Sequence, residues 1–152
     1  MKQKPQHATI TLEHTYQAPI ERVFSEFADP VARARWSTSS GDVLIYDQTE
    51  FREGGRDLFR CGPKNDAKFH GVTFYHLMVP NKCVVSTEML ETDGQQLAVS
   101  LNTLEFEAAG EGTHLTITVQ MVSLVGPGMI AGYEAGNKGA LENFSRHLSG
   151  YR

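Results

Sequence analysis

One long helical segment constrains the fold more than any other feature of the sequence. In Pro127–Leu148, apolar or near-apolar side chains recur every three or four residues, which places them on one face of a helix. Pro127 suits the first turn, because the N–H that proline lacks would have no partner there. The apolar positions are Ile130, Tyr133, Ala140, Leu141, Phe144 and Leu148. The sequence thus predicts one amphipathic helix that covers an apolar surface supplied by the rest of the chain.

Three glycines, Gly132, Gly136 and Gly139, lie inside this helix at similar spacing. Each costs about 1 kcal/mol relative to alanine in a helix interior. We therefore expect them to serve a close approach, in which the missing side chains set how near the covered surface lies to the helix.

The upstream sequence supplies that surface as a series of strands. Residues 8–16 alternate polar and apolar side chains, the period of a half-buried strand. Two short helices follow, one opened by Pro19 and one running from Asp29-Pro30 to Trp36. After residue 41, turn residues such as Gly54-Gly55 separate short strand-like runs. The expected strands there are 43–46, 56–61, 68–79, 83–89, 96–106 and 115–121. The short connections predict an antiparallel meander in a single α+β domain over residues 1–152.

Composition excludes several classes of partner. The formal net charge of -4 and the lack of a basic stretch argue against nucleic acid binding. No apolar run approaches the roughly 20 residues that span a bilayer, so no membrane partner is expected. Cys61 and Cys83 fit neither a disulfide framework nor a CxxC site, and we expect two reduced, semi-buried thiols in a cytoplasmic protein.

No motif for metal or nucleophilic chemistry is found. His70 and His76 share a strand face but lie roughly 20 Å apart, and no HxH or HExxH string occurs. The serines have no nucleophile elbow, and the glycine-rich turns are not phosphate loops. Carboxylate pairs such as Glu88 with Glu91 are read as solvated faces. The prediction is no catalytic residue, no metal and no cofactor.

Several strings, taken in order, resemble the SRPBCC superfamily (START/Bet v 1-like helix-grip domains), in the branch similar to the C-terminal domain of the Hsp90 ATPase activator. The matching strings are Ala18-Pro19-Ile20-Glu21-Arg22-Val23-Phe24, Asp29-Pro30 with Trp36, Gly54-Gly55-Arg56, Val79-Pro80-Asn81, Glu88-Met89 with Asp93-Gly94, Ser100-Leu101 with Thr103 and Glu105-Phe106, Gly112-Thr113, and the helix with Gly132, Gly136 and Leu141. The resemblance implies a curved antiparallel sheet of six or seven strands that grips the long helix. It also implies a cavity that holds an apolar or amphipathic molecule in many relatives, without implying a reaction. Branch members often carry tryptophan where this chain has Tyr133.

Aromatic side chains on the expected strands and helix, together with a few polar ones, are the candidates for such a cavity. Asn137 follows Tyr133 by one turn on the covering face, and burying an unpaired amide costs of order 1–3 kcal/mol. It therefore either bonds to backbone or faces a wet cavity. Trp36 either plugs the core or lines the cavity. The candidate residues are Trp36, Phe59, His70, Phe74, Asn102, Tyr133, Asn137 and Leu141.

Three functions remain open at this point. The first is a non-enzymatic module that holds a small hydrophobic or aromatic ligand between sheet and helix. The second is a cyclase/aromatase-like or hydrolase-like enzyme with His70, Asp57 or Tyr133 as an acid or base, although the sequence shows no converging pair of titratable groups. The third is a chaperone-associated interaction domain, which needs an exposed apolar patch on the convex sheet face or at residues 122–125. The superfamily allows a homodimer, but no residue marks an interface.

Overall fold

The computed structural model describes residues 3–38 and 41–150 and contains one seven-stranded antiparallel sheet with three helices. The strands follow the order β1-β7-β6-β5-β4-β3-β2, so each strand except β1 lies beside its neighbour in sequence. The elements are β1 (Gln6–Tyr16), α1 (Ile20–Ala28), α2 (Pro30–Trp36), β2 (Asp42–Gln48), β3 (Arg56–Pro63), β4 (Phe69–Val79), β5 (Cys83–Thr92), β6 (Gln95–Ala109), β7 (Gly112–Ser123) and α3 (Pro127–Leu148). The predicted α+β helix-grip fold is confirmed.

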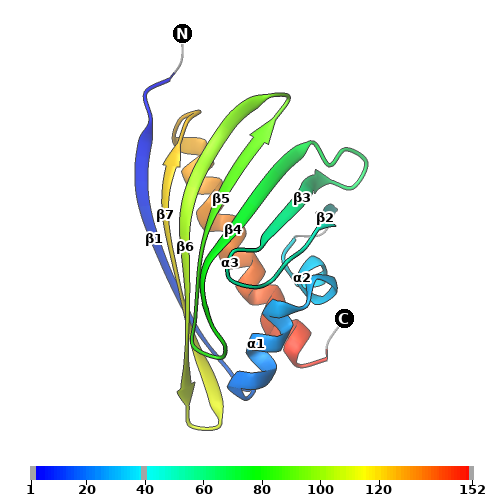
Figure 1. Ribbon diagram of the computed structural model, residues 1–152, viewed down its shortest axis with the longest axis vertical. Coiled ribbons are helices and arrows are strands. Elements are labelled where there is room, and N and C mark those ends of the chain that lie inside the picture. Colours follow the sequence, from blue (N-terminus) through cyan, green and yellow to red (C-terminus); the bar gives the residue numbers. More distant parts are fainter. Residues whose placement is uncertain (1–2, 39–40, 151–152) are drawn as a thin grey trace.

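The sheet is curved, and α3 lies along its concave side, with α1 and α2 beside the C-terminal end of α3 (Figure 1). The concave face carries the alternate residues of each strand. On β7, for example, Leu115, Ile117, Val119 and Met121 are all buried. The long helix thus covers the apolar face of the sheet, as its own pattern predicts.

The C-terminal half of α3 is fixed in an aromatic core. Phe144 is fully buried and packs edge-on against Tyr16 and Phe27, with ring centroids 4.9 and 5.0 Å away. The Trp36 ring lies 4.6 Å from the Phe144 ring. Polar groups add to this attachment, because the Tyr16 hydroxyl donates to the Leu141 carbonyl oxygen at 3.2 Å. This end of the helix is ordinary close-packed protein interior.

Neighbouring elements also hold the last turn of α3. The Arg22 guanidinium of α1 donates to the carbonyl oxygen of Leu148 at 2.6 Å, which satisfies one of the carbonyls that a helix end leaves without a partner. Glu26, also on α1, lies 2.8 Å from His147 Nε2. The short helix α1 therefore clamps the C-terminal end of α3 to the domain.

The expected role of the α3 glycines is wrong. A Cβ atom added at Gly132, Gly136 or Gly139 would meet no atom within 4 Å. The three residues therefore face open space, and no close approach of the sheet depends on them. The close approach occurs instead at Gly71 on β4, where an added Cβ would overlap the Phe59 ring of the neighbouring strand.

No helix in the described part of the chain combines the length and the apolar character needed to cross a membrane.

Candidate ligand cavity

A cavity of about 430 Å³ lies between the concave face of the sheet, α2 and the middle of α3. Its volume falls in the range of about 300–1,000 Å³ found for small-molecule sites. Most of the lining is aromatic or aliphatic, with a few polar side chains. The lining residues are Phe27, Arg33, Trp36, Ser37, Phe51, Phe59, Cys61, Thr73, Tyr75, Val84, Ser86, Glu88, Leu90, Asn102, Leu104, Ile117, Tyr133, Gly136, Asn137, Ala140 and Leu141.

Six of the eight residues predicted from the sequence meet in this lining: Trp36, Phe59, Asn102, Tyr133, Asn137 and Leu141. The other two do not line it. His70 is exposed, and both His70 and Phe74 have the opposite strand parity to Thr73 and Tyr75, which face the cavity. Because successive side chains of a strand point to opposite faces, these two residues belong to the convex side of β4. His70, predicted from the sequence as a polar residue of the cavity, is therefore absent from the cavity wall.

The sequence left two alternatives for Trp36, packing in the core or lining the cavity, and two for Asn137, bonding to backbone or facing the cavity. The structure shows both features for each residue. Trp36 is packed in the aromatic core and also lines the cavity. Asn137 donates from Nδ2 to the Tyr133 backbone carbonyl at 2.8 Å while its side chain borders the cavity. Asn102 donates from Nδ2 to Ser100 Oγ at 3.1 Å. The amides are thus partly paired by the protein and lie at the cavity surface.

A polar row crosses the concave face of the sheet at the cavity. The strand register places Asp57 of β3 opposite Thr73 of β4, Thr73 opposite Glu88 of β5, and Glu88 opposite Ser100 of β6. On each strand, the neighbouring inward positions are mostly apolar or aromatic. We refer to Asp57, Thr73, Glu88 and Ser100 as the polar row. Two of its members, Thr73 and Glu88, line the cavity and supply hydrogen-bonding groups to its wall.

Glu88 is the titratable group that the sequence analysis missed. It was read as part of a solvated carboxylate pair, but it lines the cavity and accepts a hydrogen bond from the Tyr133 hydroxyl at 3.2 Å. Burial raises the pKa of Glu88 to about 7, although the hydrogen bond from Tyr133 acts in the opposite direction. Burial and the nearby Glu88 carboxylate raise the pKa of Tyr133, so this residue stays a phenol and a donor.

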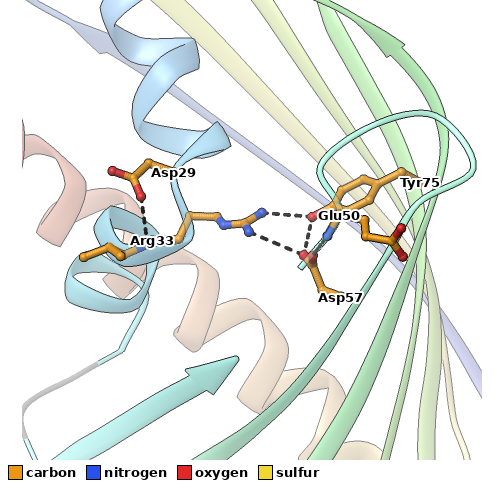
Figure 2. A network of polar contacts seen from close by, with 6 residues as sticks. Asp29, Arg33, Glu50, Asp57 and Tyr75 are labelled. Carbon is orange, nitrogen blue, oxygen red and sulfur yellow. Dashed lines mark hydrogen bonds and ion pairs between the residues drawn. The ribbon is translucent and has the colours of Figure 1, made fainter. Parts of the chain in front are cut away.

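A second polar cluster joins α2 to the sheet at the edge of the cavity (Figure 2). Arg33 Nη1 donates to the Tyr75 hydroxyl at 2.9 Å, and Nη2 lies 3.5 Å from Asp57 Oδ2. The Tyr75 hydroxyl in turn donates to Asp57, and the Glu50 backbone N–H donates to Asp57 Oδ1 at 3.3 Å. We call Arg33, Tyr75 and Asp57 the buried triad, since each is less than 10% exposed.

The charges of the buried triad compensate one another. Burial lowers the pKa of Arg33, but electrostatic interactions with Tyr46, Tyr75 and Asp57 and the hydrogen bond to Tyr75 outweigh that effect and raise it above its ordinary value. The guanidinium also lies over the Tyr46 ring, 4.9 Å from its centroid. Asp57, one of the candidate acids or bases, is therefore committed to holding α2 in place.

Cys61 provides a thiol in the cavity wall. Burial raises its pKa to about 11, so the thiol is protonated at neutral pH and weakly nucleophilic. Cys83 is free as well and does not line the cavity. The prediction of two unpaired, partly buried cysteines is confirmed.

A smaller hollow of about 250 Å³ adjoins the cavity between α3 and β3. Ser37, Cys61, Gly136 and Ala140 line both spaces. The exposed residues Ala135 and Gly136 of α3 border the hollow, which places it toward the surface of the domain.

Two other sites considered from the sequence can be placed. Within residues 3–38 and 41–150, no three His, Cys, Asp or Glu side chains lie close enough to hold a metal ion together. Residues 122–125 are buried or half-buried, whereas Met89, Val99 and Leu101 on the convex face are each about 40% exposed. Leu77 and Val79 of β4 are exposed to a similar extent, so an apolar interaction surface on the convex face would lie over β4, β5 and β6.

A curved sheet, a gripped C-terminal helix and a cavity between them define a helix-grip domain of the SRPBCC (Bet v 1-like) class. Residues 17–149 match the family described as "Activator of Hsp90 ATPase homolog 1-like protein", and the chain belongs to that family. No curated protein matches the sequence.

Several solved structures share both the fold and most of its length. An uncharacterised protein from Rhizobium leguminosarum is 28% identical, with a TM-score of 0.85 over 96% of this chain and 97% of that chain. Protein Mll3558 from Rhizobium loti is 30% identical, with a TM-score of 0.83 over 94% and 98% of the two chains. Protein CV1439 from Chromobacterium violaceum, at 23% identity and a TM-score of 0.76 over 90% and 94%, shares the fold. These structures support the family assignment and the architecture. The function has to be inferred from the residues of the cavity, because one fold hosts many functions.

Proposed function

We propose that this protein is a binding module that holds a small, largely apolar or aromatic molecule between the sheet and α3. The observation that carries the proposal is the cavity of about 430 Å³, whose walls are aromatic and aliphatic with a few polar groups. Such a lining is typical of sites that enclose an apolar body and orient it through a small number of hydrogen bonds.

The polar groups of the lining indicate a ligand-binding site and not a core that only stabilises the fold. Thr73, Ser86, Glu88 and Asn102 all face the cavity, although each would be better solvated on the convex side of the sheet. A protein core that merely stabilises the fold gains nothing from these side chains, whereas a ligand with polar substituents can pair with them.

Native mass spectrometry of the protein purified from its own host gives the first test. We expect a bound molecule that leaves on denaturation. A fluorescence titration with the neutral apolar probe N-phenyl-1-naphthylamine then tests the location of the site.

Two glycines of α3 offer a matched pair of variants for that titration. Gly136 lines the cavity and Gly132 does not, and both have open space where a side chain would begin. Gly136→Phe is expected to weaken probe binding at least 10-fold by filling the cavity, while Gly132→Phe leaves it unchanged. Equal binding by both variants, or no binding by the parent protein, would contradict the proposal.

Acid–base catalysis in the same cavity is a second candidate, supported by the Glu88–Tyr133 hydrogen bond. The enzyme hypothesis requires two titratable groups within reach of each other, and this pair supplies them at 3.2 Å. A carboxyl whose pKa is about 7 can give or take a proton at neutral pH. If the host ligand is turned over, Glu88→Gln should abolish the turnover, measured by mass spectrometry of the ligand. Turnover that persists in this variant would exclude Glu88 as the acid or base.

A further inference from the structure

Glu88 is a cavity carboxyl without a cation to pair with. Its only hydrogen-bond partner among the described residues is the Tyr133 hydroxyl, which engages Oε2 and leaves Oε1 facing no donor of the protein. Among residues 3–38 and 41–150, the lining contains no lysine and no histidine. Arg33, the one cation among the described lining residues, is held by Tyr75 and Asp57 of the buried triad.

The elements around Glu88 offer neutral groups on every side. Across the sheet, Thr73 of β4 and Ser100 of β6 are its direct neighbours. Tyr133 faces it from α3, and the Glu88 carboxylate also contributes to raising the pKa of Cys61 of β3 and of Tyr46 of β2. Burial raises the pKa of Cys61 to about 11 and that of Tyr46 to about 12, so both are neutral at pH 7. Ionised Glu88 therefore leaves the cavity with one uncompensated negative charge.

We propose that the cavity ligand is a cationic amine on an apolar, aromatic or alicyclic body, whose ammonium group pairs with the Glu88 carboxylate. The proposal rests on the ligand-binding function above and names the chemical class of the ligand. An ammonium supplies the counter-charge that the protein does not, and Thr73 of β4 and Tyr133 of α3 line the cavity with Glu88.

The energetics favour this ligand over a neutral one of the same shape. A carboxylate that is largely withdrawn from water without a counter-ion is costly, and this desolvation raises the pKa of the half-buried Glu88 to about 7. A cation beside it stabilises the ionised form in a medium of low dielectric constant. Binding of an ammonium at or below neutral pH therefore expels the Glu88 proton, whereas binding of a neutral molecule does not.

Three naphthalene probes of nearly equal size separate these cases. They are 2-(aminomethyl)naphthalene as the ammonium, 2-(hydroxymethyl)naphthalene as the neutral isostere and 2-naphthoate as the anion. Isothermal titration at pH 8 is expected to give the amine at least a 10-fold lower Kd than the alcohol, and the naphthoate the weakest binding. At pH 5.5, where Glu88 is protonated, the preference for the amine should fall several-fold.

The variant Glu88→Gln keeps the size and the hydrogen-bonding capacity of the side chain without its charge. It should lose the preference for the amine over the alcohol at both pH values. Titrations at pH 6.5 in two buffers of different ionisation enthalpy should show proton release for the parent protein with the amine and none for Glu88→Gln.

The outcomes distinguish the two proposals. If the alcohol binds as tightly as the amine to the parent protein at pH 8, or if Glu88→Gln retains the amine preference, the ligand class is wrong while the cavity remains a binding site. If none of the three probes binds and none protects Cys61 from alkylation relative to Cys83, the binding function itself fails.

Discussion

The two halves of α3 have the same helical backbone and different surroundings. In the C-terminal half, Leu141, Phe144 and Leu148 are buried, and Tyr16 and Arg22 donate hydrogen bonds to the helix backbone. In the N-terminal half no side chain of the helix is fully buried, and the only hydrogen bond from one of its side chains to the sheet among the described residues joins Tyr133 to Glu88. One helix therefore serves as core at one end and as the wall of a cavity at the other.

This difference separates stability from binding along a single element. The C-terminal half, with α1, Trp36 and the aromatic core, fixes the position of the helix. The N-terminal half is then free to carry glycines and polar side chains that a packed core would not tolerate. Substitutions in the two halves should consequently act on different properties of the protein.

The largest loss of stability is expected for Phe144→Ala. Phe144 is fully buried among Tyr16, Phe27 and Trp36, and truncating such a side chain costs about 3–5 kcal/mol. The half-buried Ile130 of the N-terminal half is the matched position, and Ile130→Ala should cost less than half as much. Urea denaturation followed by circular dichroism measures both. If both substitutions lowered the free energy of unfolding by similar amounts, the two halves of α3 would not differ in their contribution to stability.

Asp57→Asn is expected to cost about 3 kcal/mol, because it leaves the buried Arg33 guanidinium without its counter-ion. The exposed pair of Asp47 and Arg60, at 2.9 Å, is the control, and Asp47→Asn should cost far less than Asp57→Asn, because solvent screens an exposed ion pair. The same denaturation experiment applies. A cost below 1 kcal/mol for Asp57→Asn would mean that the buried triad does not hold α2 to the sheet.

The pH dependence of stability isolates Glu88. Its pKa in the folded protein, about 7, is above that of an unfolded glutamate, so between pH 4.5 and 7 the folded state binds more protons than the unfolded one. The free energy of unfolding should therefore fall as pH rises through this window, by on the order of 2 kcal/mol from this group. Comparing the parent protein with Glu88→Gln at pH 5 and pH 8 should reveal that fall only in the parent. An identical pH response in both proteins would place the Glu88 carboxyl in water.

The smallest effect, and the only gain, is expected from Gly132→Ala and Gly139→Ala. Both positions face open space in the helix, so alanine should stabilise the protein by about 0.5–1 kcal/mol each through helix propensity. Gly71→Ala is the opposite control, since its Cβ would overlap Phe59 and must destabilise the protein. Thermal denaturation measures the three variants. A loss of stability in Gly132→Ala would mean that a neighbouring element does lie close to α3 at this position.

Much of the fold was accessible from the sequence, because local signals agreed with one another. Pro127 marks the beginning of α3, and the order of β2 to β7 follows from short turns such as Asp93-Gly94. The face of α3 was also predicted correctly, since the spacing of Leu141, Phe144 and Leu148 determines it. The explanation of the glycines failed because spacing within a helix contains no information about the distance to its neighbours.

Only part of the site could be predicted from the sequence. Where both faces of a strand carry apolar residues, the alternation of side chains does not show which face points into the cavity. On β4, Phe74 and Tyr75 are adjacent aromatic residues, and the sequence alone does not tell which one faces inward. His70, a predicted cavity residue, shares the parity of Phe74 and lies on the convex side. On β5, Glu88 shares its parity with Val84 and Leu90, a signal for an inward carboxyl that the neighbouring Val85 and Met89 obscure.

Amide hydrogen exchange along α3, with and without 2-(hydroxymethyl)naphthalene, tests the central claim most directly. Without ligand, we expect residues 129–138 to exchange faster than residues 141–148, which the aromatic core protects. With saturating ligand, exchange should slow in residues 129–140 and stay unchanged in residues 141–148. Equal protection of both halves without ligand, or slowing confined to residues 141–148 with it, would contradict the division of the helix into core and cavity wall.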